Sequence, residues 1–192
     1  MARRSTMSFE LLRAPMENLR DGKALDKEAL ERLYVKLEKP MFNVVYRWLW
    51  SSGDAQDVVQ EAFLKIWRAR DNVDLATVEA LLYRTALNLA SNRRRSARLW
   101  RWIGIDAASS ETSAEPSSEE AMASAQMHQS VRAAIDALPD RLRQVILPCE
   151  YSELTHQEIG AALGIPSGTV GSRRNAAIAQ LSKQLGDVEG LT

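Results

Sequence analysis

The sequence is poor in the residues that build disulfide frameworks and metal centres. It has one cysteine and two histidines in 192 residues, which excludes internal disulfide bonds and gives little basis for a metal site. No apolar run approaches the roughly 20 residues of a membrane-spanning helix, and the basic start of the chain lacks the apolar core of a signal peptide. We therefore expect a cytoplasmic protein without cofactor, metal or direct membrane insertion.

Net charge is absent as well, because 25 basic residues balance 25 acidic ones. The chain as a whole is not drawn to nucleic acid, so any basic surface must be local. Catalytic arrangements are also missing: no Ser/His/Asp, Cys/His or paired-carboxylate pattern accompanies a glycine-rich loop or metal-ligand spacing. The sequence predicts a binding protein and not an enzyme, with 45% hydrophobic residues to build its cores.

The most informative stretch is residues 155–181. Thr155 and Glu158 have the spacing of a capping box, which predicts a helix start. Gly164 suits the left-handed position that ends a helix, and Ser167 suits the cap of the next one. The second helix opens with small, polar and basic residues: Ser167, Thr169, Ser172, Arg173 and Arg174. Such a helix can read a DNA major groove, although an ordinary helical hairpin with a solvated arginine pair fits the same pattern.

The first third of the chain also has helical periodicity. Residues 26–50 carry apolar residues at helical spacing, and Pro40 predicts a break or a restart between them. A turn at residues 51–54 follows, after which Asp54 is expected to cap a helix that runs to residue 70. One face of that helix is apolar, with Val58, Ala62, Phe63 and Ile66. Its other face carries Asp57, Gln60, Glu61, Leu64 and Arg68, a mixture that is usually only solvated.

A third helix is predicted over residues 78–102. No acidic residue occurs between positions 80 and 105, yet this stretch contains Arg84, Arg93, Arg94, Arg95, Arg98 and Arg101, with Tyr83, Trp100 and Trp102 nearby. Arginines interleaved with aromatics suit a surface that neutralises phosphates and stacks the bases of a single strand. The alternative is a solvated helix end whose arginines complement its negative pole.

Residues 106–130 change composition to serine, alanine, glutamate and threonine. Every charge between positions 106 and 120 is negative, which predicts a flexible acidic linker. Its back half, residues 119–129, is rich in alanine and methionine and is expected to be helical. In the helix that follows, Pro148 is predicted to end the helix early, and Cys149 reads as a small buried apolar residue.

Several blocks of this sequence resemble one protein family. The segment EIGAALGIPSGTVGSRRNAAIAQL looks like the region 4 helix-turn-helix of the extracytoplasmic-function (ECF, group 4) sigma factors, which direct bacterial RNA polymerase to promoters. DVVQEAFLKIW resembles region 2.2, LLYRTALNLASN resembles regions 2.3 and 2.4, and AIDALPDRLRQVIL resembles the start of region 4. The blocks stand in the family's order and are separated by the expected linker.

The resemblance implies three binding surfaces. It places Asp57, Gln60, Glu61 and Leu64 against the clamp helices of core RNA polymerase. It places Asn88, Asn92, Arg93, Arg94 and Arg95 on the −10 promoter element, beside a base pocket shaped by residues 71–77. It places Ser167, Thr169, Ser172, Arg173 and Arg174 on the −35 element. It also implies an anti-sigma factor, often membrane-bound, that would hold the protein at the inner membrane.

The chain departs from the family at three positions. Leu81 stands where the family commonly has tryptophan, and Leu87 where it often has arginine, so the −10 preference is open. Gly171 stands where relatives often carry a basic residue in the recognition helix. Fewer phosphate contacts predict weaker −35 binding with a shallower salt dependence.

The sequence thus predicts an all-α protein of two small helical domains. The expected divisions are a tail at residues 1–22, region 2 at 23–105, the linker at 106–128, region 4 at 129–187 and a tail at 188–192. The predicted function is an alternative sigma factor serving a stress- or signal-responsive set of genes. The rival is a stand-alone dimeric helix-turn-helix regulator with an N-terminal sensor or dimerisation domain, which requires a two-fold operator. A helical scaffold that binds only proteins is a third interpretation.

Overall fold

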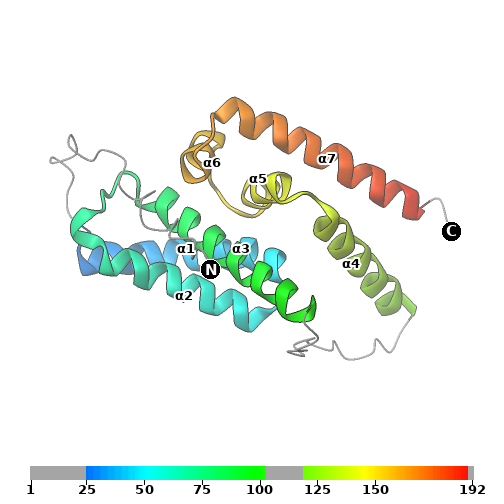
Figure 1. The fold of residues 1–192 in the computed structure, drawn as a ribbon, viewed down its shortest axis with the longest axis horizontal. Coiled ribbons are helices and arrows are strands. Elements are labelled where there is room, and N and C mark those ends of the chain that lie inside the picture. The colour runs from blue at the N-terminus through cyan, green and yellow to red at the C-terminus, as the bar shows by residue number, and fades with distance from the viewer. Residues whose placement is uncertain (1–24, 103–118, 190–192) are drawn as a thin grey trace, which may run out of the picture.

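The fold is all-α, as the sequence predicts. The computed structural model describes residues 25–102 and 119–189, and the tail and most of the linker lie outside this range. The described helices are α1 (Lys27–Leu49), α2 (Ser52–Arg68), a 3₁₀ turn (Arg70–Asn72), α3 (Val78–Trp102), α4 (Glu119–Ala137), α5 (Asp140–Tyr151), α6 (His156–Leu163) and α7 (Ser167–Glu189). Helices α1 to α3 form a first domain, and α4 to α7 form a second (Figure 1).

The first domain is a three-helix bundle. Asp26 caps α1 by accepting a hydrogen bond from the amide of Ala29 at 2.7 Å, which satisfies one of the free amides of the first turn. The predicted apolar stripe of α2 is buried, and it packs against α1 and α3. Side chains from all three helices, including Met41, Trp48 and Leu82, form the core.

The second domain contains the predicted helix-turn-helix. The turn around Pro139 begins α5, which packs against α7, while α6 and α7 form the motif itself. Val145 of α5, Ile159 of α6 and Val170 of α7 are completely buried in a small core between these helices. The back half of the predicted linker is helical, because α4 begins at Glu119.

Two proline predictions were wrong. Helix α1 runs without a break through Pro40, and α5 continues past Pro148 to Tyr151. A proline inside a helix removes one hydrogen bond and crowds the preceding turn, but packing can offset that cost. Here Met41 and Val44 beside the first proline are buried, and Pro148 is itself buried. Tertiary contacts therefore outweigh the local preference.

The start of α2 also differs from the prediction. The helix begins at Ser52, inside the predicted turn, and its cap is Ser51, whose side chain accepts a hydrogen bond from the amide of Asp54 at 3.3 Å. Asp54 lies in the first turn, where a carboxylate favours the positive end of the helix dipole. The side chain of Asp54 is thereby left available for a contact with α3.

The two domains touch each other extensively. Helix α1 packs against α4 and α5, and α3 packs against α6. The larger apolar core is continuous across this boundary, running from Trp48 of α1 to Leu142, Ile146 and Leu147 of α5. The first and second domains therefore share one core in this structure.

Candidate binding surfaces

The first surface is the outer face of α2. Asp57, Gln60 and Leu64 are exposed, and Glu61 is half-buried and forms an ion pair with Lys65 at 3.3 Å. Leu64 is 45% exposed and lies among polar neighbours, although it is a large apolar side chain. All four residues stand opposite the buried stripe of α2, so the structure brings this predicted set together on one face.

The second surface is on α3, where five predicted residues divide between two environments. Asn88, Asn92 and Arg95 are exposed, and Arg95 donates a hydrogen bond to the side chain of Asn92 at 3.4 Å. Arg93 turns toward α2: its guanidinium lies 2.6 Å from the carboxylate of Asp54 and 3.4 Å from that of Asp57.

Arg94 faces the second domain. Its guanidinium donates to the carboxylate of Asp136 at 3.0 Å and to the backbone carbonyl of the same residue at 3.3 Å. The side chain of Arg94 is only 13% exposed. Arg94 is therefore not on the same open surface as Asn88 and Asn92.

The prediction that Tyr83 stacks on nucleic acid was wrong. The residue is 2% exposed and belongs to the core of the first domain, where bases have no access. Burial raises the pKa of its hydroxyl, and a hydrogen bond with Ser152 of the second domain opposes that shift. The side chains of the other two aromatics, Trp100 and Trp102, lie outside the described part of the chain.

The third surface is the helix-turn-helix, which forms as predicted. The Thr155 amide donates to the Glu158 carboxylate at 2.7 Å, and the Glu158 amide donates to the Thr155 hydroxyl at 3.3 Å. The Thr155 hydroxyl also donates to the Glu158 carboxylate at 2.7 Å, and this bond together with the one from the Thr155 amide lowers the pKa of Glu158, because both favour the charged carboxylate. Gly164 ends α6 in the left-handed conformation, with φ of 67°. A Cβ added to Gly160 would lie 2.7 Å from the carbonyl oxygen of Ile165, so only glycine allows this close turn.

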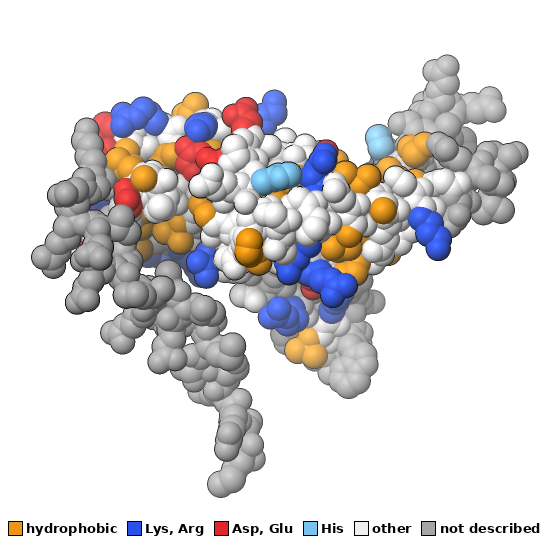
Figure 2. Space-filling view, turned by 90° about the horizontal axis from the view of Figure 1, so that it is seen from above, with side chains coloured by type: hydrophobic (Ala, Val, Ile, Leu, Met, Phe, Trp, Pro, Cys, Tyr) orange, Lys and Arg blue, Asp and Glu red, His pale blue; other side chains and the backbone are white. Residues whose placement is uncertain are grey.

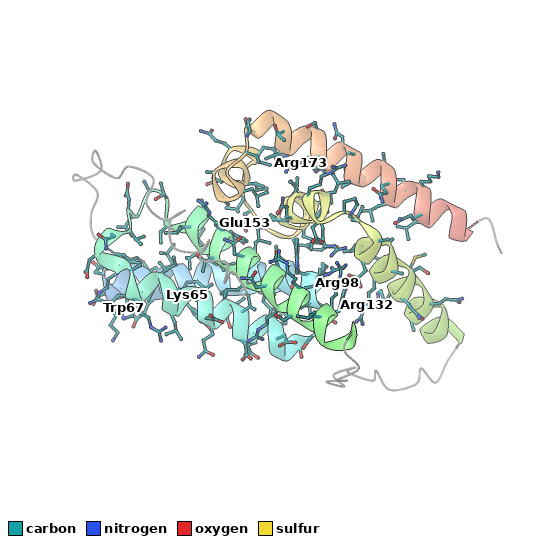
Figure 3. All side chains as sticks on the ribbon, in the orientation of Figure 1. Lys65, Trp67, Arg98, Arg132, Glu153 and Arg173 are labelled. Carbon is teal, nitrogen blue, oxygen red and sulfur yellow. The ribbon has the colours of Figure 1, made fainter. Side chains whose placement is uncertain are left out.

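The opening of α7 presents most of its predicted residues to solvent. Ser167 and Ser172 are exposed, and Thr169 and Arg173 are half-buried. Arg174 differs, because its guanidinium forms an ion pair with Glu150 of α5 at 2.7 Å. Figure 3 shows Arg173 on the first half of α7. On the face seen in Figure 2, acidic side chains gather toward the end away from α7 and are sparse where α7 runs.

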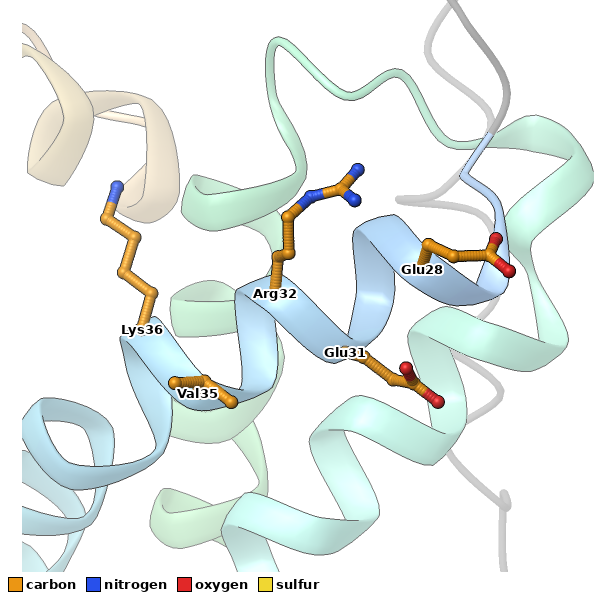
Figure 4. Close-up of a pocket in the computed structure, with 5 residues that line it drawn as sticks. All are labelled: Glu28, Glu31, Arg32, Val35 and Lys36. Carbon is orange, nitrogen blue, oxygen red and sulfur yellow. The ribbon is translucent and has the colours of Figure 1, made fainter.

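The described residues offer little for catalysis or metal binding. Within residues 25–102 and 119–189, no three His, Cys, Asp or Glu side chains gather closely enough to hold a metal ion. A hollow on α1 is open and lined by Glu28, Glu31, Arg32, Val35 and Lys36, and Figure 4 shows Lys36 reaching from it toward the second domain. Cys149 is only half-buried, although burial still raises the pKa of its thiol.

Sequence reasoning missed the residues that join the domains. Arg143 of α5 is completely buried and lies 5.6 Å from the ring centre of Trp48 in the first domain. Within its own domain it donates to the backbone carbonyls of Ile135, Asp136 and Leu138 at 2.6 to 2.9 Å. Arg47 and Arg132 each lie over an aromatic ring of the other domain. An arginine among leucines in DRLRQVIL was the one local signal, because that spacing puts Arg143 near the helix's apolar side.

Comparison with known proteins decides the family. Residues 33–99 match the model of Sigma-70 region 2, and residues 128–181 match that of Sigma-70 region 4. The chain is 34% identical over 157 residues to the ECF RNA polymerase sigma-E factor of Escherichia coli (strain K12), covering 77% of this chain and 82% of the relative. The chain belongs to the ECF sigma factors of the sigma-70 family.

Other relatives agree with this assignment. The chain is 29% identical to the ECF RNA polymerase sigma factor SigW of Bacillus subtilis (strain 168), over 90% of this chain and 97% of the relative. It is 30% identical to the ECF RNA polymerase sigma factor SigE of Mycolicibacterium smegmatis over 76% of its own length, but spans only 57% of that relative. As an ECF sigma factor it directs RNA polymerase to promoters and is not itself an enzyme.

The fold likeness extends to a solved complex. The sigma factor RpoE of Bartonella quintana, crystallised with the anti-sigma factor NepR, aligns with a TM-score of 0.61 at 20% identity, over 84% of this chain and 98% of that one. This likeness concerns the fold. Among the helices that the structure describes, none has the length and apolar character needed to cross a membrane.

Proposed function

We propose that this ECF sigma factor binds core RNA polymerase through α2, the −10 element through α3 and the −35 element through the opening of α7. The observation that carries the proposal is the helix-turn-helix with its capping box and glycine turn, joined in one chain to a bundle that exposes a polar α2 face. The proposed regions are those of the sequence analysis: 23–105 and 129–187, joined by 106–128.

Core polymerase binds Asp57, Gln60, Glu61 and Leu64 in this proposal. The exposed leucine supports it, because a large apolar side chain among polar ones gains most from a partner that covers it. The neighbouring amide and carboxylates supply hydrogen-bonding groups around that apolar centre. Such an arrangement is typical of the core and rim of a protein interface.

The −10 strand binds Asn88, Asn92 and Arg95, with Arg93 and Arg94 joining when their carboxylate partners release them. Asparagine amides can both donate to and accept from the edge of an unpaired base. Arginines neutralise the phosphates between bases. The exposure of the two asparagines supports their role in selecting sequence.

The −35 duplex binds Ser167, Thr169, Ser172 and Arg173, the residues that open the second helix of the motif. Hydroxyls suit phosphates and base edges, and an arginine suits guanine. Arg174 also binds the DNA when a phosphate replaces the Glu150 carboxylate as the partner of its guanidinium. The small side chains at this end allow the helix backbone to come close to the groove.

An anti-sigma factor is the proposed regulator. The complex of RpoE with NepR supports a protein inhibitor for a chain of this fold, and the exposed Leu64 offers it an anchor. We place the chain in the cytoplasm, held at the inner membrane where that inhibitor is itself membrane-bound. Its genes then respond to the stress or signal that releases the inhibitor.

Run-off transcription with purified core polymerase tests the proposal. The wild-type chain is expected to start transcription at a small set of promoters, and mapping those start sites defines both elements. Asn88→Ala should change −10 selectivity only, and Arg173→Ala should change −35 affinity only. Equal relaxation at both elements by either substitution would contradict the division between α3 and α7.

A further inference from the structure

The opening of α7 carries little positive charge. Residues 167–172, SGTVGS, contain no charged side chain. The first two cations of the helix, Arg173 and Arg174, are both half-buried, and Arg174 is paired with Glu150 at 2.7 Å. A helix that lies in a major groove is positioned by hydrogen bonds and ion pairs to the DNA phosphates. Any further donor to the phosphates at this end of α7 has to come from a neighbouring element.

Helix α6 lies beside the first turns of α7 and supplies one side chain there (Figure 1). His156, the first residue of α6, extends its imidazole to Gly171 of α7. A Cβ added to Gly171 would lie 3.8 Å from Nδ1 and 3.9 Å from Cε1 of that ring, which is ordinary van der Waals contact. The imidazole therefore covers a position of α7 that has no side chain of its own.

The imidazole of His156 is exposed, and the motif does not depend on it to start α6. The capping box runs between Thr155 and Glu158, whose carboxylate accepts from both the amide and the hydroxyl of Thr155. Among the residues that the structure describes, none forms a hydrogen bond or an ion pair with the imidazole. Its ring nitrogens are therefore available to a ligand.

Gly171 lies at the edge of the outward side of α7. Val170 and Ala177 are completely buried and mark the side that faces the core. The exposed Ser172 and Asn175 mark the opposite side. At about 3.6 residues per turn, Gly171 falls between the two sides and closer to the outward one. The imidazole is thus held at the rim of the side that faces the groove, next to where the DNA backbone runs.

The chemistry of imidazole suits a phosphate oxygen. The ring donates one N–H when it is neutral and two when it is charged, so it can donate to a phosphate in either state. A phosphate contact carries no sequence information by itself, but it fixes the register and orientation of the helix in the groove. Base recognition then stays with the hydroxyls of α7 and with Arg173.

We propose that His156 is a further −35 contact: its imidazole, lying over Gly171, donates to a phosphate of the −35 duplex at the place where α7 has no side chain. This inference rests on the proposed function of α7, because it requires the −35 duplex to lie against the opening of that helix. It adds a residue of α6 to a surface that the sequence predicted on α7 alone. The contact offsets part of the weaker binding expected from a glycine at position 171.

The test uses the holoenzyme, which is the full chain bound to core polymerase, and measures its affinity for a promoter. His156→Phe keeps a ring over Gly171 but removes the N–H, whereas His156→Lys keeps a donor. We expect affinity to fall about two- to ten-fold in His156→Phe, as for one lost hydrogen bond, and to stay within about two-fold of wild type in His156→Lys. His128→Phe, at an exposed site on α4, is the matched control and should leave the affinity unchanged.

The phenylalanine variant also separates binding from packing. If the imidazole only packs on Gly171, His156→Phe should bind the promoter like wild type, and the proposal is wrong. Equal melting temperatures of wild type and His156→Phe exclude unfolding as the cause of a lower affinity. A contact to a phosphate should also lower the affinity for matched and mismatched −35 sequences alike.

A second experiment locates the phosphate. Each phosphate of the −35 element is replaced in turn by an uncharged methylphosphonate, and the holoenzyme is titrated with each duplex. One replacement should weaken wild-type binding about two- to ten-fold and have no further effect on His156→Phe, because both changes remove the same hydrogen bond. Replacements that weaken both proteins equally at every position would overturn the proposal.

Position 171 provides a gain of binding. Gly171→Arg can be accommodated, since a Cβ there meets the imidazole at an ordinary contact distance. The arginine should raise promoter affinity more in His156→Phe than in wild type, where the imidazole already holds the phosphate. Gly171→Ala is the control, because it adds a methyl group without a donor. Equal gains from Gly171→Arg in both backgrounds would show that the two positions act independently, against the proposal.

Arg173→Ala distinguishes a failure of this inference from a failure of the proposed function. If Arg173→Ala weakens −35 binding and His156→Phe does not, α7 reads the −35 element without His156, and only the inference is wrong. If neither substitution affects −35 binding, the proposed function of α7 fails together with the inference. We expect both substitutions to weaken binding, with a loss of sequence discrimination in Arg173→Ala alone.

Discussion

The guanidinium of Arg93 lies 2.6 Å from the carboxylate of Asp54, a residue 39 positions earlier in the chain. The same guanidinium reaches Asp57, which belongs to the proposed polymerase face. One arginine thus connects the proposed −10 surface on α3 with the proposed polymerase face on α2. In the proposed −10 complex, the DNA phosphates have to compete with these two carboxylates for Arg93.

Removing this competition should strengthen −10 binding. Asp54→Asn is expected to raise the affinity for a single-stranded −10 oligonucleotide by up to about five-fold, because a partly exposed ion pair is worth up to about 1 kcal/mol. Titration by fluorescence anisotropy at two salt concentrations measures the effect. Glu31→Gln on α1 is the control, with the same change in charge. Weaker binding by Asp54→Asn would mean that the pair positions Arg93 for DNA.

The polymerase face is tested by separating affinity from stability. Gln60→Ala with Leu64→Ala removes exposed side chains, so the melting temperature should change little while core binding weakens by ten-fold or more. Ile66→Ala on the buried stripe of the same helix should instead cost about 2–5 kcal/mol of stability. Calorimetry and co-purification with core polymerase give the two readouts. If the double variant loses stability but binds core polymerase normally, Gln60 and Leu64 stabilise the fold and do not contact the polymerase.

The two arginines of α7 should behave unequally. Arg173→Ala is expected to weaken −35 duplex binding by about 1–3 kcal/mol if it reaches a base edge. Arg174→Ala should have a smaller effect, because Glu150 already holds that guanidinium. Glu150→Gln should strengthen binding through the released arginine. Lys183→Ala, further along α7 at an exposed site, is the control in the same duplex titration, and an equal loss from both arginine variants would refute the difference.

The capping box of Thr155 and Glu158 predicts that the stability of the fold depends on pH. The pKa of Glu158 is lowered in the folded state, so its stabilising effect is full above the unfolded pKa of about 4.3 and is lost as the pH falls through the folded value. Thr155→Ala removes the two hydrogen bonds of the hydroxyl, one donated to the Glu158 carboxylate and one accepted from the Glu158 amide, and should cost about 1 kcal/mol near pH 7. That cost should shrink below about pH 4, as denaturant unfolding at both pH values would reveal. A cost that is constant across this range would exclude the carboxylate as its source.

The glycine at the turn gives a steric prediction. Gly160→Ala places a Cβ 2.7 Å from the backbone oxygen of Ile165, and a backbone atom cannot move aside as a flexible side chain can. We expect the free energy of unfolding to fall by about 1–3 kcal/mol. We also expect weaker −35 binding, because the angle between α6 and α7 changes. Gly186→Ala, near the other end of α7 where a Cβ meets open space, is the matched control. Denaturant unfolding and duplex titration should both separate the two variants.

Local signals in the sequence predicted the helix-turn-helix and the limits of α1 and α3 well. Capping boxes, glycine turns and periodic apolar residues act over a few positions, so a linear reading detects them. The predictions at Pro40 and Pro148 were wrong because tertiary contacts there outweigh the tendency of proline to end a helix.

The contacts between the two domains had no such signal. Whether Arg94 meets solvent, DNA or Asp136 depends on a residue 42 positions away, and that pairing is decided only by how the domains dock. Tyr83 was also misplaced: several arginines follow it in the sequence, but its side chain is buried at the boundary and hydrogen-bonds with Ser152 of the second domain. The exposure of residues on open helix faces was therefore easier to predict than the contacts of residues at the boundary.

The apolar core that both domains share also bears on the lifetime of the protein in a cell. When the domains separate, side chains such as Leu142, Ile146 and Trp48 lose part of their cover unless polymerase replaces it. Exposed apolar surface on a partly opened chain is what proteases and chaperones recognise. We therefore expect a chain whose domains separate away from polymerase to be degraded faster than one whose domains stay packed together.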